Sequence, residues 1–365
     1  FSFGDSGSAL TVKVQIHSQE FYVMTGSGGA LGIAEAYILG YWSADDVVML
    51  MRIILKNRSI LLSLNNGLAK LLNPVNKLIH RSRQNTLKGS KENILAHYDL
   101  SNDFYKLWLD PTMTYSCGYF SNPDTSLEDA SIEKLDRICR KLNLSEKDHV
   151  LEIGTGWGSF SIHAAKNYGC NIKTTTISDA QYEYAKAHVA QEGLESKINV
   201  INKDYRKLDG QYDKIVSIEM LEAVGEKNWP IYFNKVNELL TDQGEALIQS
   251  ILIEDWRFDD YRKKADFIQC YIFPGGMLPS LEVLKRIFPD QGMELQHVMH
   301  FGDSYAQTMS LWNRLFQEAW LQIKQFGFDS RFKRMWEYYL AYCETGFRTG
   351  AIDVAMLHLK KTASI

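Results

Sequence analysis

Residues 150–160, VLEIGTGWGSF, constrain the fold of this chain most, because an apolar run leads directly into a glycine-rich turn. Residues 150–153 are rich in β-prone side chains and favour a buried strand. The three glycines of the turn are Gly154, Gly156 and Gly158. Glycine lets the backbone turn sharply and approach a ligand without a Cβ clash. The segment therefore predicts the strand–turn–helix corner of a nucleotide-binding domain, although an ordinary corner that binds nothing fits the same pattern.

The spacing of the glycines indicates which ligand to expect. They are two residues apart, unlike the dinucleotide pattern GxGxxG, and no GK[ST] follows to hold phosphates. Glu152 places an acid inside the apolar strand. An acid here suits a ligand with positive charge, and S-adenosylmethionine carries both an ammonium and a sulfonium group. We expect Glu152 to organise the turn near this positive end.

The composition narrows the class of protein. The 365 residues are enough for two domains, and 45% hydrophobic with 23% charged residues is typical of a globular protein. A net charge of −4 argues against nucleic acid as the main partner. The five cysteines form no CxxC pair, so no metal site and no disulfide framework is predicted, and a reducing compartment fits. No apolar run reaches the ~20 residues that span a bilayer.

Two domains are predicted. Residues 1–80 form an α+β accessory domain, with strands at 10–16 and 21–24, a glycine-rich turn at 26–29, and helices at 34–39, 47–55 and 60–79. Residues 81–91, RSRQNTLKGSK, are polar and basic and read as a linker, with contact to anionic lipid headgroups as the alternative. Residues 92–365 form the catalytic domain.

Strands and helices alternate in the catalytic domain. Strands are expected at 149–153, 171–177, 198–201, 212–218 and 244–253, and helices at 127–142, 159–168, 179–191 and 229–240. This order predicts a parallel sheet with helices on both faces. The carboxyl ends of the strands then form one rim, where ligands bind. The rim residues are Gly154, Thr176, Asp204, Glu219 and Gln249. Further helices are expected at 255–273, 310–326 and 332–345.

Several polar residues near this rim suit an adenosine ligand. Thr176 and Gln181 follow the second strand, where nucleotide-binding folds hold the ribose hydroxyls. Asp204 follows the third strand and is a candidate acceptor for the adenine amino group, with the Tyr205 ring beside it for stacking. The alternative for Asp204 is a cap on a turn.

Residues 97–120, HYDLSNDFYKLWLDPTMTYSCGYF, are dense in aromatic and polar groups. The block favours either a lid over the ligand or an aromatic-rich helix packed on the sheet. Cys117 has no histidine near it in sequence, so a small buried residue is a better interpretation than a nucleophile.

The block 97–120, together with LEIGTGWGS, TTTISDAQ, SIEMLEAVG and YIFPGGMLPS, resembles the cyclopropane-fatty-acid-phospholipid synthases, which are S-adenosylmethionine-dependent. The resemblance covers nearly the whole chain and implies a Rossmann-like class I methyltransferase domain. Residues 29–47, GALGIAEAYILGYWSADDV, are similar to the accessory domain of the phospholipid-acting members. The related mycolic-acid synthases lack this unit.

The resemblance implies an activity: transfer of the donor methyl to the cis double bond of a phospholipid acyl chain, with bicarbonate as the base that closes the cyclopropane ring. Alternatives are a methyl-branched or methylene product, or a catalytically silent lipid-binding protein. The implied donor-binding residues are Tyr115, Ser116, Gly154, Gly156, Thr176, Gln181 and Asp204. The implied bicarbonate ligands are the backbone of Cys117 and Ile251 and the side chains of Glu222, Gln249 and Tyr305.

Two positions depart from many bacterial members, which have histidine where this chain has Gln249 and read FEHVG around Glu222. Plant-type members carry similar glutamine and EAVG patterns. A glutamine amide can donate a hydrogen bond, but it does not titrate. A carbocation formed at the alkene would be stabilised by aromatic faces. The candidates are Tyr115, Tyr119, Phe120, Phe273 and Tyr305.

The implied partner is an unsaturated phospholipid at a membrane surface. We therefore expect a cytoplasmic protein associated peripherally with the inner face of the membrane. The accessory domain would grip the lipid surface, or would serve a structural or homodimerising role.

Overall fold

The computed structural model describes residues 7–57 and 100–362. The described part of the N-terminal unit contains β1 (Val14–Ile16), α1 (Glu20–Ile38), β2 (Trp42–Ala44) and α2 (Val47–Lys56), and its two strands pair antiparallel. The expected helix at 60–79 and the linker at 81–91 lie outside the described residues.

The prediction of a strand at 21–24 and a turn at 26–29 is wrong, because both segments belong to α1. The helix is interrupted only at Gly29, whose φ of 57° lies in the left-handed region that glycine tolerates. The second half of α1 buries Ala34, Ala36 and Tyr37. Residues 21–24 gain no strand partner, because β1 pairs with β2, and their backbone hydrogen bonds are made within α1 instead.

The catalytic domain is built on one seven-stranded sheet of order β5-β4-β3-β6-β7-β9-β8. The strands are β3 (His149–Ile153), β4 (Asn171–Thr176), β5 (Ile198–Asn202), β6 (Tyr212–Ile218), β7 (Leu240–Ile253), β8 (Met293–His300) and β9 (Ile352–Lys361). The first five in this order are parallel, as predicted. The all-parallel expectation fails at β9, which runs antiparallel to both β7 and β8.

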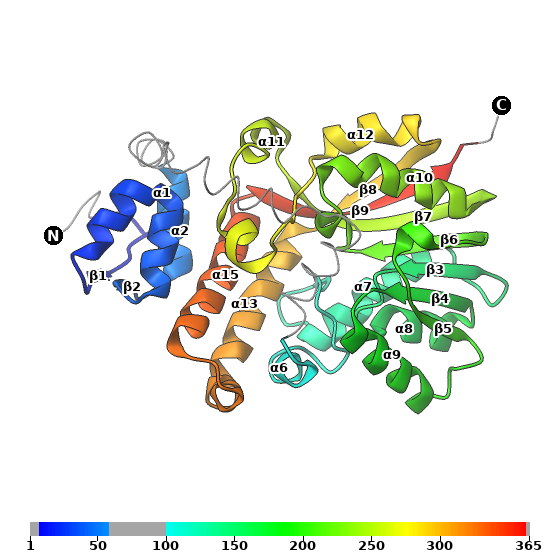
Figure 1. Cartoon of the computed structure of the whole chain (residues 1–365), viewed down its shortest axis with the longest axis horizontal. Coiled ribbons are helices and arrows are strands. Elements are labelled where there is room, and N and C mark those ends of the chain that lie inside the picture. Colours follow the sequence, from blue (N-terminus) through cyan, green and yellow to red (C-terminus); the bar gives the residue numbers. More distant parts are fainter. Residues whose placement is uncertain (1–6, 58–99, 363–365) are drawn as a thin grey trace.

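Helices cover both faces of this sheet (Figure 1). The main ones are α7 (Leu127–Lys141), α8 (Ser159–Tyr168), α9 (Asp179–Gln191), α10 (Trp229–Leu239), α12 (Leu281–Asp290), α13 (Gly302–Glu318) and α15 (Ser330–Arg348). The shorter ones are α6 (Asn102–Lys106), α11 (Asp255–Tyr261) and α14 (Trp320–Ile323). Serine side chains cap α7 and α9, since Ser126 and Ser178 accept from backbone amides of the first turn.

One predicted helix is split. Instead of a continuous helix at 255–273, α11 ends at Tyr261 and a π-helical turn, η4 (Ile268–Ile272), follows. The Asp266 carboxylate accepts a 2.9 Å hydrogen bond from the backbone N–H of Gln269. This side-chain contact starts the new turn and separates it from α11.

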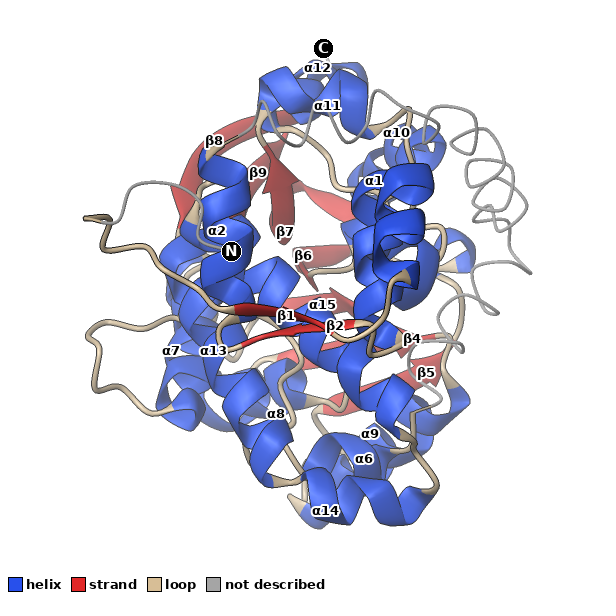
Figure 2. Ribbon diagram, turned by 90° about the vertical axis from the view of Figure 1, so that its left-hand side faces the viewer, coloured by secondary structure: helices blue, strands red, loops and turns tan. Residues whose placement is uncertain are grey.

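Helices α13 and α15 lie between the N-terminal unit and the sheet (Figure 1). Figure 2 shows α1 and α2 in front of this helix pair. Both α1 and α2 pack on α15. Side-chain hydrogen bonds also join the units: Tyr37 Oη donates to Glu337 at 3.3 Å, and Tyr271 Oη donates to Glu35 at 2.5 Å. The N-terminal unit is thus anchored to the helices that also support the catalytic sheet.

The described part of the aromatic block 97–120 is largely core. Phe104 and Trp108 are buried, and the Phe104 ring packs edge-on against Phe332 and Trp336 of α15. The packed-helix interpretation therefore fits α6, while the end of the block, residues 113–116, lines a cavity.

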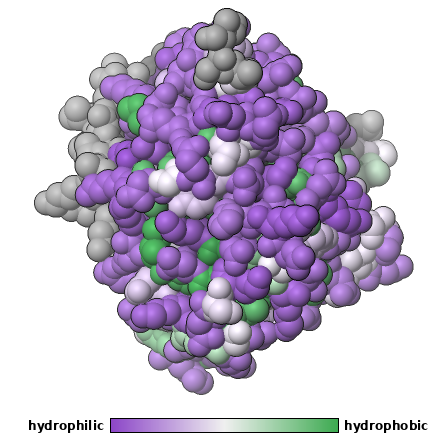
Figure 3. All heavy atoms as spheres, turned by 90° about the vertical axis from the view of Figure 1, so that its right-hand side faces the viewer, coloured by the Kyte–Doolittle hydropathy of each residue, from purple (hydrophilic) through white to green (hydrophobic). Residues whose placement is uncertain are grey.

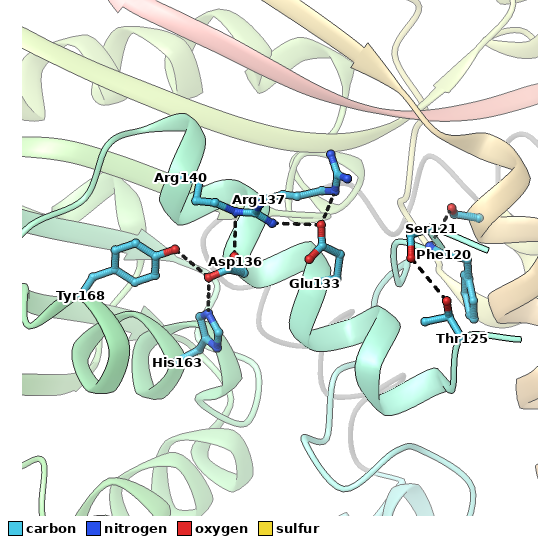
Figure 4. A network of polar contacts seen from close by, with 10 residues as sticks. Phe120, Ser121, Thr125, Glu133, Asp136, Arg137, Arg140, His163 and Tyr168 are labelled. Atoms are coloured by element: carbon cyan, nitrogen blue, oxygen red, sulfur yellow. Dashed lines mark hydrogen bonds and ion pairs between the residues drawn. The ribbon is translucent and has the colours of Figure 1, made fainter.

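A polar network joins α7 to α8 (Figure 4). Asp136 accepts from Tyr168 Oη at 2.6 Å and from Arg140 Nε at 2.7 Å, and His163 lies 3.4 Å away. Burial would raise the pKa of Asp136, but these partners together lower it. The network fixes two helices that pack beside the glycine turn.

The face of the molecule opposite the N-terminal unit is mainly hydrophilic, with small scattered apolar spots (Figure 3). Within the described ranges, no helix combines the length and the apolar character needed to cross a membrane.

Candidate active site

A cavity lies at the carboxyl ends of β3, β4 and β6, where the topology predicts a ligand. Predicted donor-binding residues on its wall are Tyr115, Ser116, Glu152, Gly154, Gly156, Thr176, Gln181, Asp204 and Tyr205. Gly158 is the exception. It does not line the cavity, has a φ of 94° and is the N-cap residue of α8.

The glycine turn brings backbone close to this cavity. Gly154 has a φ of 103°, and a Cβ there would lie 3.0 Å from Cγ of Met220. Gly156 has a φ of 54° and open space around its missing Cβ, so its need for glycine is conformational. The first two glycines thus shape the wall of the cavity.

Glu152 organises the turn. One of its carboxylate oxygens, Oε2, accepts from Ser161 Oγ at 2.5 Å and from Thr174 Oγ1 at 2.6 Å. These contacts tie β3 to α8 and to β4. Burial raises the pKa of Glu152 to about 7, against the opposing effect of the two hydroxyl donors.

The predicted adenosine contacts are pre-arranged by side-chain hydrogen bonds. Thr176 Oγ1 donates to Gln181 Oε1 at 2.8 Å. Asp204 is both a rim residue and a cap, because it receives the backbone N–H and the guanidinium of Arg206, with Nη2 2.7 Å from Oδ2. Burial would raise the pKa of Asp204, but the hydrogen bonds and charge of Arg206 lower it. Arg206, which no sequence motif marks as functional, keeps this carboxylate ionised.

Glu219 connects the cavity to the second group of predicted residues. It follows β6, lines the cavity, and is part-buried. Oε1 accepts from the backbone N–H of Cys117 at 2.9 Å and from Gln249 Nε2 at 2.8 Å. Oε2 accepts from Tyr305 Oη at 2.5 Å. The rim prediction places Glu219 correctly at the end of a strand, but no sequence motif indicates a function for this residue.

Glu222 lies beside this group and makes different contacts. Its Oε1 accepts from the backbone N–H of Ile251 at 2.5 Å and from Ser250 Oγ at 3.1 Å. Its Oε2 is buried with no partner among the described residues. Burial, together with the nearby charge of Glu219, raises the pKa of Glu222 to about 8.

The implied bicarbonate ligands therefore do come together, but they do not fit a bound ion. The Cys117 amide, Gln249 and Tyr305 already donate to Glu219, and the Ile251 amide donates to Glu222. A further anion here would meet two carboxylates and no uncommitted donor from this set.

Two other groups complete the site. Lys134 is buried, and its Nζ donates to Ser116 Oγ at 2.8 Å on the cavity wall. Burial lowers the pKa of Lys134, while the charge of Glu219 acts to raise it. The Cys117 thiol is fully buried, and burial raises its pKa well above the ordinary value. This agrees with the interpretation of Cys117 as a small buried residue, and its backbone N–H is the group that contacts Glu219.

The predicted aromatic wall is only partly at the cavity. Tyr115 lines it, and its hydroxyl lies 3.0 Å from that of Tyr339. Tyr119 packs under the Arg137 guanidinium at 3.6 Å. The Tyr305 ring stacks on Phe347, with 4.3 Å between the centroids, while its hydroxyl faces Glu219. Within residues 7–57 and 100–362, no cluster of histidine, cysteine and acidic side chains is placed to hold a metal ion.

The sheet order and the cavity define the class I fold of S-adenosylmethionine-dependent methyltransferases, and comparison with solved structures agrees. The mycolic acid cyclopropane synthase CmaA1, solved in complex with SAH and CTAB, aligns with a TM-score of 0.70 and 31% identity, covering 74% of this chain and 98% of that one.

Sequence comparison identifies the family. The profile described as mycolic acid cyclopropane synthetase matches residues 85–357. The cyclopropane-fatty-acyl-phospholipid synthase of Escherichia coli K12 is 34% identical over 357 residues, which cover 96% of this chain and 87% of that protein. The tuberculostearic acid methyltransferase UfaA1 of Mycobacterium tuberculosis is 37% identical over 338 residues, 90% of this chain and 78% of that protein. The chain belongs to the cyclopropane synthase family of S-adenosylmethionine-dependent methyltransferases.

Proposed function

We propose that this protein is a cyclopropane fatty acid synthase acting on an unsaturated phospholipid acyl chain. The observation that carries the proposal is that the glycine turn, which is typical of methyl-donor binding, and Glu219 line the same cavity. The similarity to the E. coli synthase supports the substrate class, because it extends over both the N-terminal unit and the catalytic domain.

The methyl donor supplies an electrophilic sulfonium methyl, which an isolated alkene, a weak nucleophile, requires. The protein's contribution is orientation, which can lower a barrier by ~7 kcal/mol or more. Thr176 and Gln181 are proposed to hold the ribose, and Asp204 with Tyr205 the adenine, as their places on the cavity wall suggest. Tyr115 presents an aromatic face toward positive charge that develops on the acyl chain.

Closing the ring requires a base beside the transferred methyl. The family resemblance implies bicarbonate for this role. Since its expected ligands already bind Glu219 and Glu222, we assign no step to bicarbonate in this chain.

A second product has support from one relative. The 37% identity to UfaA1, named a tuberculostearic acid methyltransferase, favours a methyl-branched or methylene product as the alternative. These outcomes share the methyl transfer and differ in the fate of the cation. Loss of a proton from the new methyl closes the ring directly, and a hydride shift before that loss gives a methylene product. Loss of a proton from a neighbouring chain carbon gives a methyl-branched alkene.

Mass spectrometry after incubation with methyl-deuterated donor and vesicles of cis-monounsaturated phospholipid separates these outcomes. Cyclopropane formation adds one CD2 unit and leaves a ring that survives mild hydrogenation with no uptake of hydrogen. A methylene product takes up hydrogen under the same conditions, and a methyl-branched product without a ring supports the relative's activity. Failure to incorporate label would exclude both and leave a silent lipid-binding protein.

The N-terminal unit is proposed to hold the protein on the inner face of the membrane. Tyr22 and Val23 of α1 are each 63% exposed, so two neighbouring apolar side chains are open to solvent. They form an apolar pair on the N-terminal unit, which α13 and α15 separate from the sheet (Figure 1).

A further inference from the structure

We propose that Glu219 is a built-in replacement for bicarbonate: its own carboxylate is the base that takes a proton from the methyl group after transfer to the alkene. The inference rests on the proposed function and names a group of this chain for a role that the family resemblance gives to an external ion.

The hydrogen-bond partners carry the inference. Three of the groups expected to hold bicarbonate donate instead to Glu219: the Cys117 N–H, Gln249 Nε2 and Tyr305 Oη. A carboxylate and a bicarbonate ion both present a planar O–C–O unit with one negative charge. The side chain therefore satisfies the same donors with the same charge, and no ion needs to be recruited from solution.

The pattern of hydrogen bonds also identifies the oxygen of Glu219 that can accept the proton. A carboxylate oxygen has two lone pairs in its plane. Oε1 uses both, on the Cys117 amide and the Gln249 amide. Oε2 accepts only the Tyr305 hydroxyl among the described residues, so its second lone pair is the one that can receive a proton.

The backbone conformation of Glu219 also supports a functional role for this residue. Glu219 has a φ of 52°, a conformation that glycine adopts readily and a glutamate rarely does. Unusual backbone conformations persist where the surrounding structure determines them, and they cluster at functional sites. Here Glu219 follows the end of β6 and lines the same cavity as Gly154.

The step balances without another reactant. The alkene π electrons form the new C–C bond to the methyl, and the C–S electron pair stays on sulfur, which leaves as a neutral thioether. The cation that remains loses a proton from the new methyl to Oε2 of Glu219. The C–H electron pair closes the second C–C bond of the ring, and the protonated carboxyl returns its proton to solvent.

Two variants test the inference. Glu219→Gly removes the carboxylate, restores the residue type that φ favours, and leaves three donors around a space of bicarbonate size. Glu219→Gln fills the same space with an amide that accepts no proton. Glu226→Gln, which alters an acid in the same segment that pairs with Arg262, is the matched control.

Turnover of phospholipid vesicles is measured in carbonate-free buffer under argon and again with added bicarbonate. Wild type and the control should show the same turnover in both buffers. Without bicarbonate, the turnover of both Glu219 variants should be about 10²- to 10⁴-fold lower than that of wild type, which is the usual contribution of a general base. Added bicarbonate should raise the turnover of Glu219→Gly at least tenfold and leave the turnover of Glu219→Gln unchanged. A wild type that requires bicarbonate, or an active Glu219→Gln, overturns the inference.

A binding measurement keeps this inference separate from the proposed lipid activity. Line broadening of 13C-bicarbonate is recorded with each protein loaded with the methyl donor's demethylated product. Binding to Glu219→Gly and none to wild type supports the replacement even if no lipid is methylated. Saturable binding to wild type that the Glu219→Gly change does not improve contradicts it, whatever the lipid assay gives.

Discussion

Tyr305 Oη lies 2.5 Å from Oε2 of Glu219, so a phenol from α13 is hydrogen-bonded to a carboxylate at the end of β6, 86 residues earlier in the chain. Burial raises the pKa of Tyr305 well above its ordinary value, which keeps the phenol protonated and a donor. The contact orients the carboxylate and leaves one lone pair of Oε2 toward the site.

Removing the Tyr305 hydroxyl should slow turnover without weakening the binding of S-adenosylmethionine. Tyr305→Phe keeps the ring stacked on Phe347 but loses one hydrogen bond to a charged group, worth about 1.5–3 kcal/mol. We expect turnover to fall about 10- to 100-fold, with the affinity for S-adenosylmethionine, measured by calorimetry, within about twofold of wild type. Tyr342→Phe, on the outer face of α15, is the control. A tenfold loss of donor affinity in Tyr305→Phe would place Tyr305 in the donor site instead.

The activity should depend on pH through Glu219. Burial raises the pKa of Glu219 above its ordinary value of 4.5, and the base must be ionised, so turnover should rise as pH rises through the raised pKa. The Tyr305 hydrogen bond lowers this pKa, and its loss in Tyr305→Phe should move the rise to higher pH. Glu222→Gln should retain the rise. Its disappearance in that variant would assign the titration to Glu222.

Stability should fall as pH rises across the range set by Glu152. Its pKa is about 7 in the folded protein against 4.5 as the ordinary value, so the folded state binds more protons between these limits. The stabilisation is therefore present below about pH 4.5 and is lost as pH rises through 7. The loss is of the order of 3 kcal/mol at ~1.4 kcal/mol per pH unit. Urea unfolding at a series of pH values measures it, and Glu152→Gln should show a flatter profile. An equal slope in both proteins would contradict the assignment.

The α7–α8 network should matter for stability and much less for chemistry. Asp136→Asn weakens contacts to Tyr168 and Arg140 (Figure 4), and we expect a loss of about 1–2 kcal/mol in the free energy of unfolding at pH 7. Because the pKa of Asp136 is lowered on folding, its contribution is present above pH 3.8 and is lost as pH falls below that value. Asp124→Asn, at an exposed loop position, should change stability by less than about 0.5 kcal/mol. Equal effects of the two substitutions would show that the network contributes nothing.

Membrane association should depend on the exposed pair of α1. Replacing Tyr22 and Val23 with serine in the full chain should reduce co-sedimentation with anionic phospholipid vesicles about tenfold or more, since two apolar side chains no longer enter the interface. Leu321→Ser, at a 77% exposed site on α14, is the control for a general loss of apolar surface. Undiminished sedimentation of the double variant would favour a structural or dimerising role for this unit.

The sequence predicted the parallel part of the sheet well because each strand is a short, buried apolar run. The bounds of β3 and β6 agree with the prediction, and those of β4 and β5 differ by one residue. The strands β8 and β9 were missed. β8 is an edge strand whose residues include Gln296, His297 and His300, so it lacks the run of apolar residues that marked the others.

The part of the candidate site that would bind the methyl donor was predicted from the sequence. The group of residues around Glu219 was predicted only in part. The glycine turn and the rim rule locate the cavity from short sequence segments. The role of Glu219 depends on Cys117, Gln249 and Tyr305, which are 102, 30 and 86 residues away in sequence. No local pattern reveals such a convergence, and only the folded chain brings these donors to one carboxylate.

The position of β9 has a consequence for the synthesis of the protein. Among the described residues β9 is the last strand in sequence, yet it lies between β7 and β8. During translation, β8 has no partner in the sheet, and the edge of β7 that carries Gln249 and Ile251 stays open, until residues up to Lys361 have left the ribosome. An open edge of this kind invites pairing with other chains. The strand that carries Gln249 is therefore enclosed on both edges only after β9 has been made, although every hydrogen-bond partner of Glu219 precedes β9 in the chain.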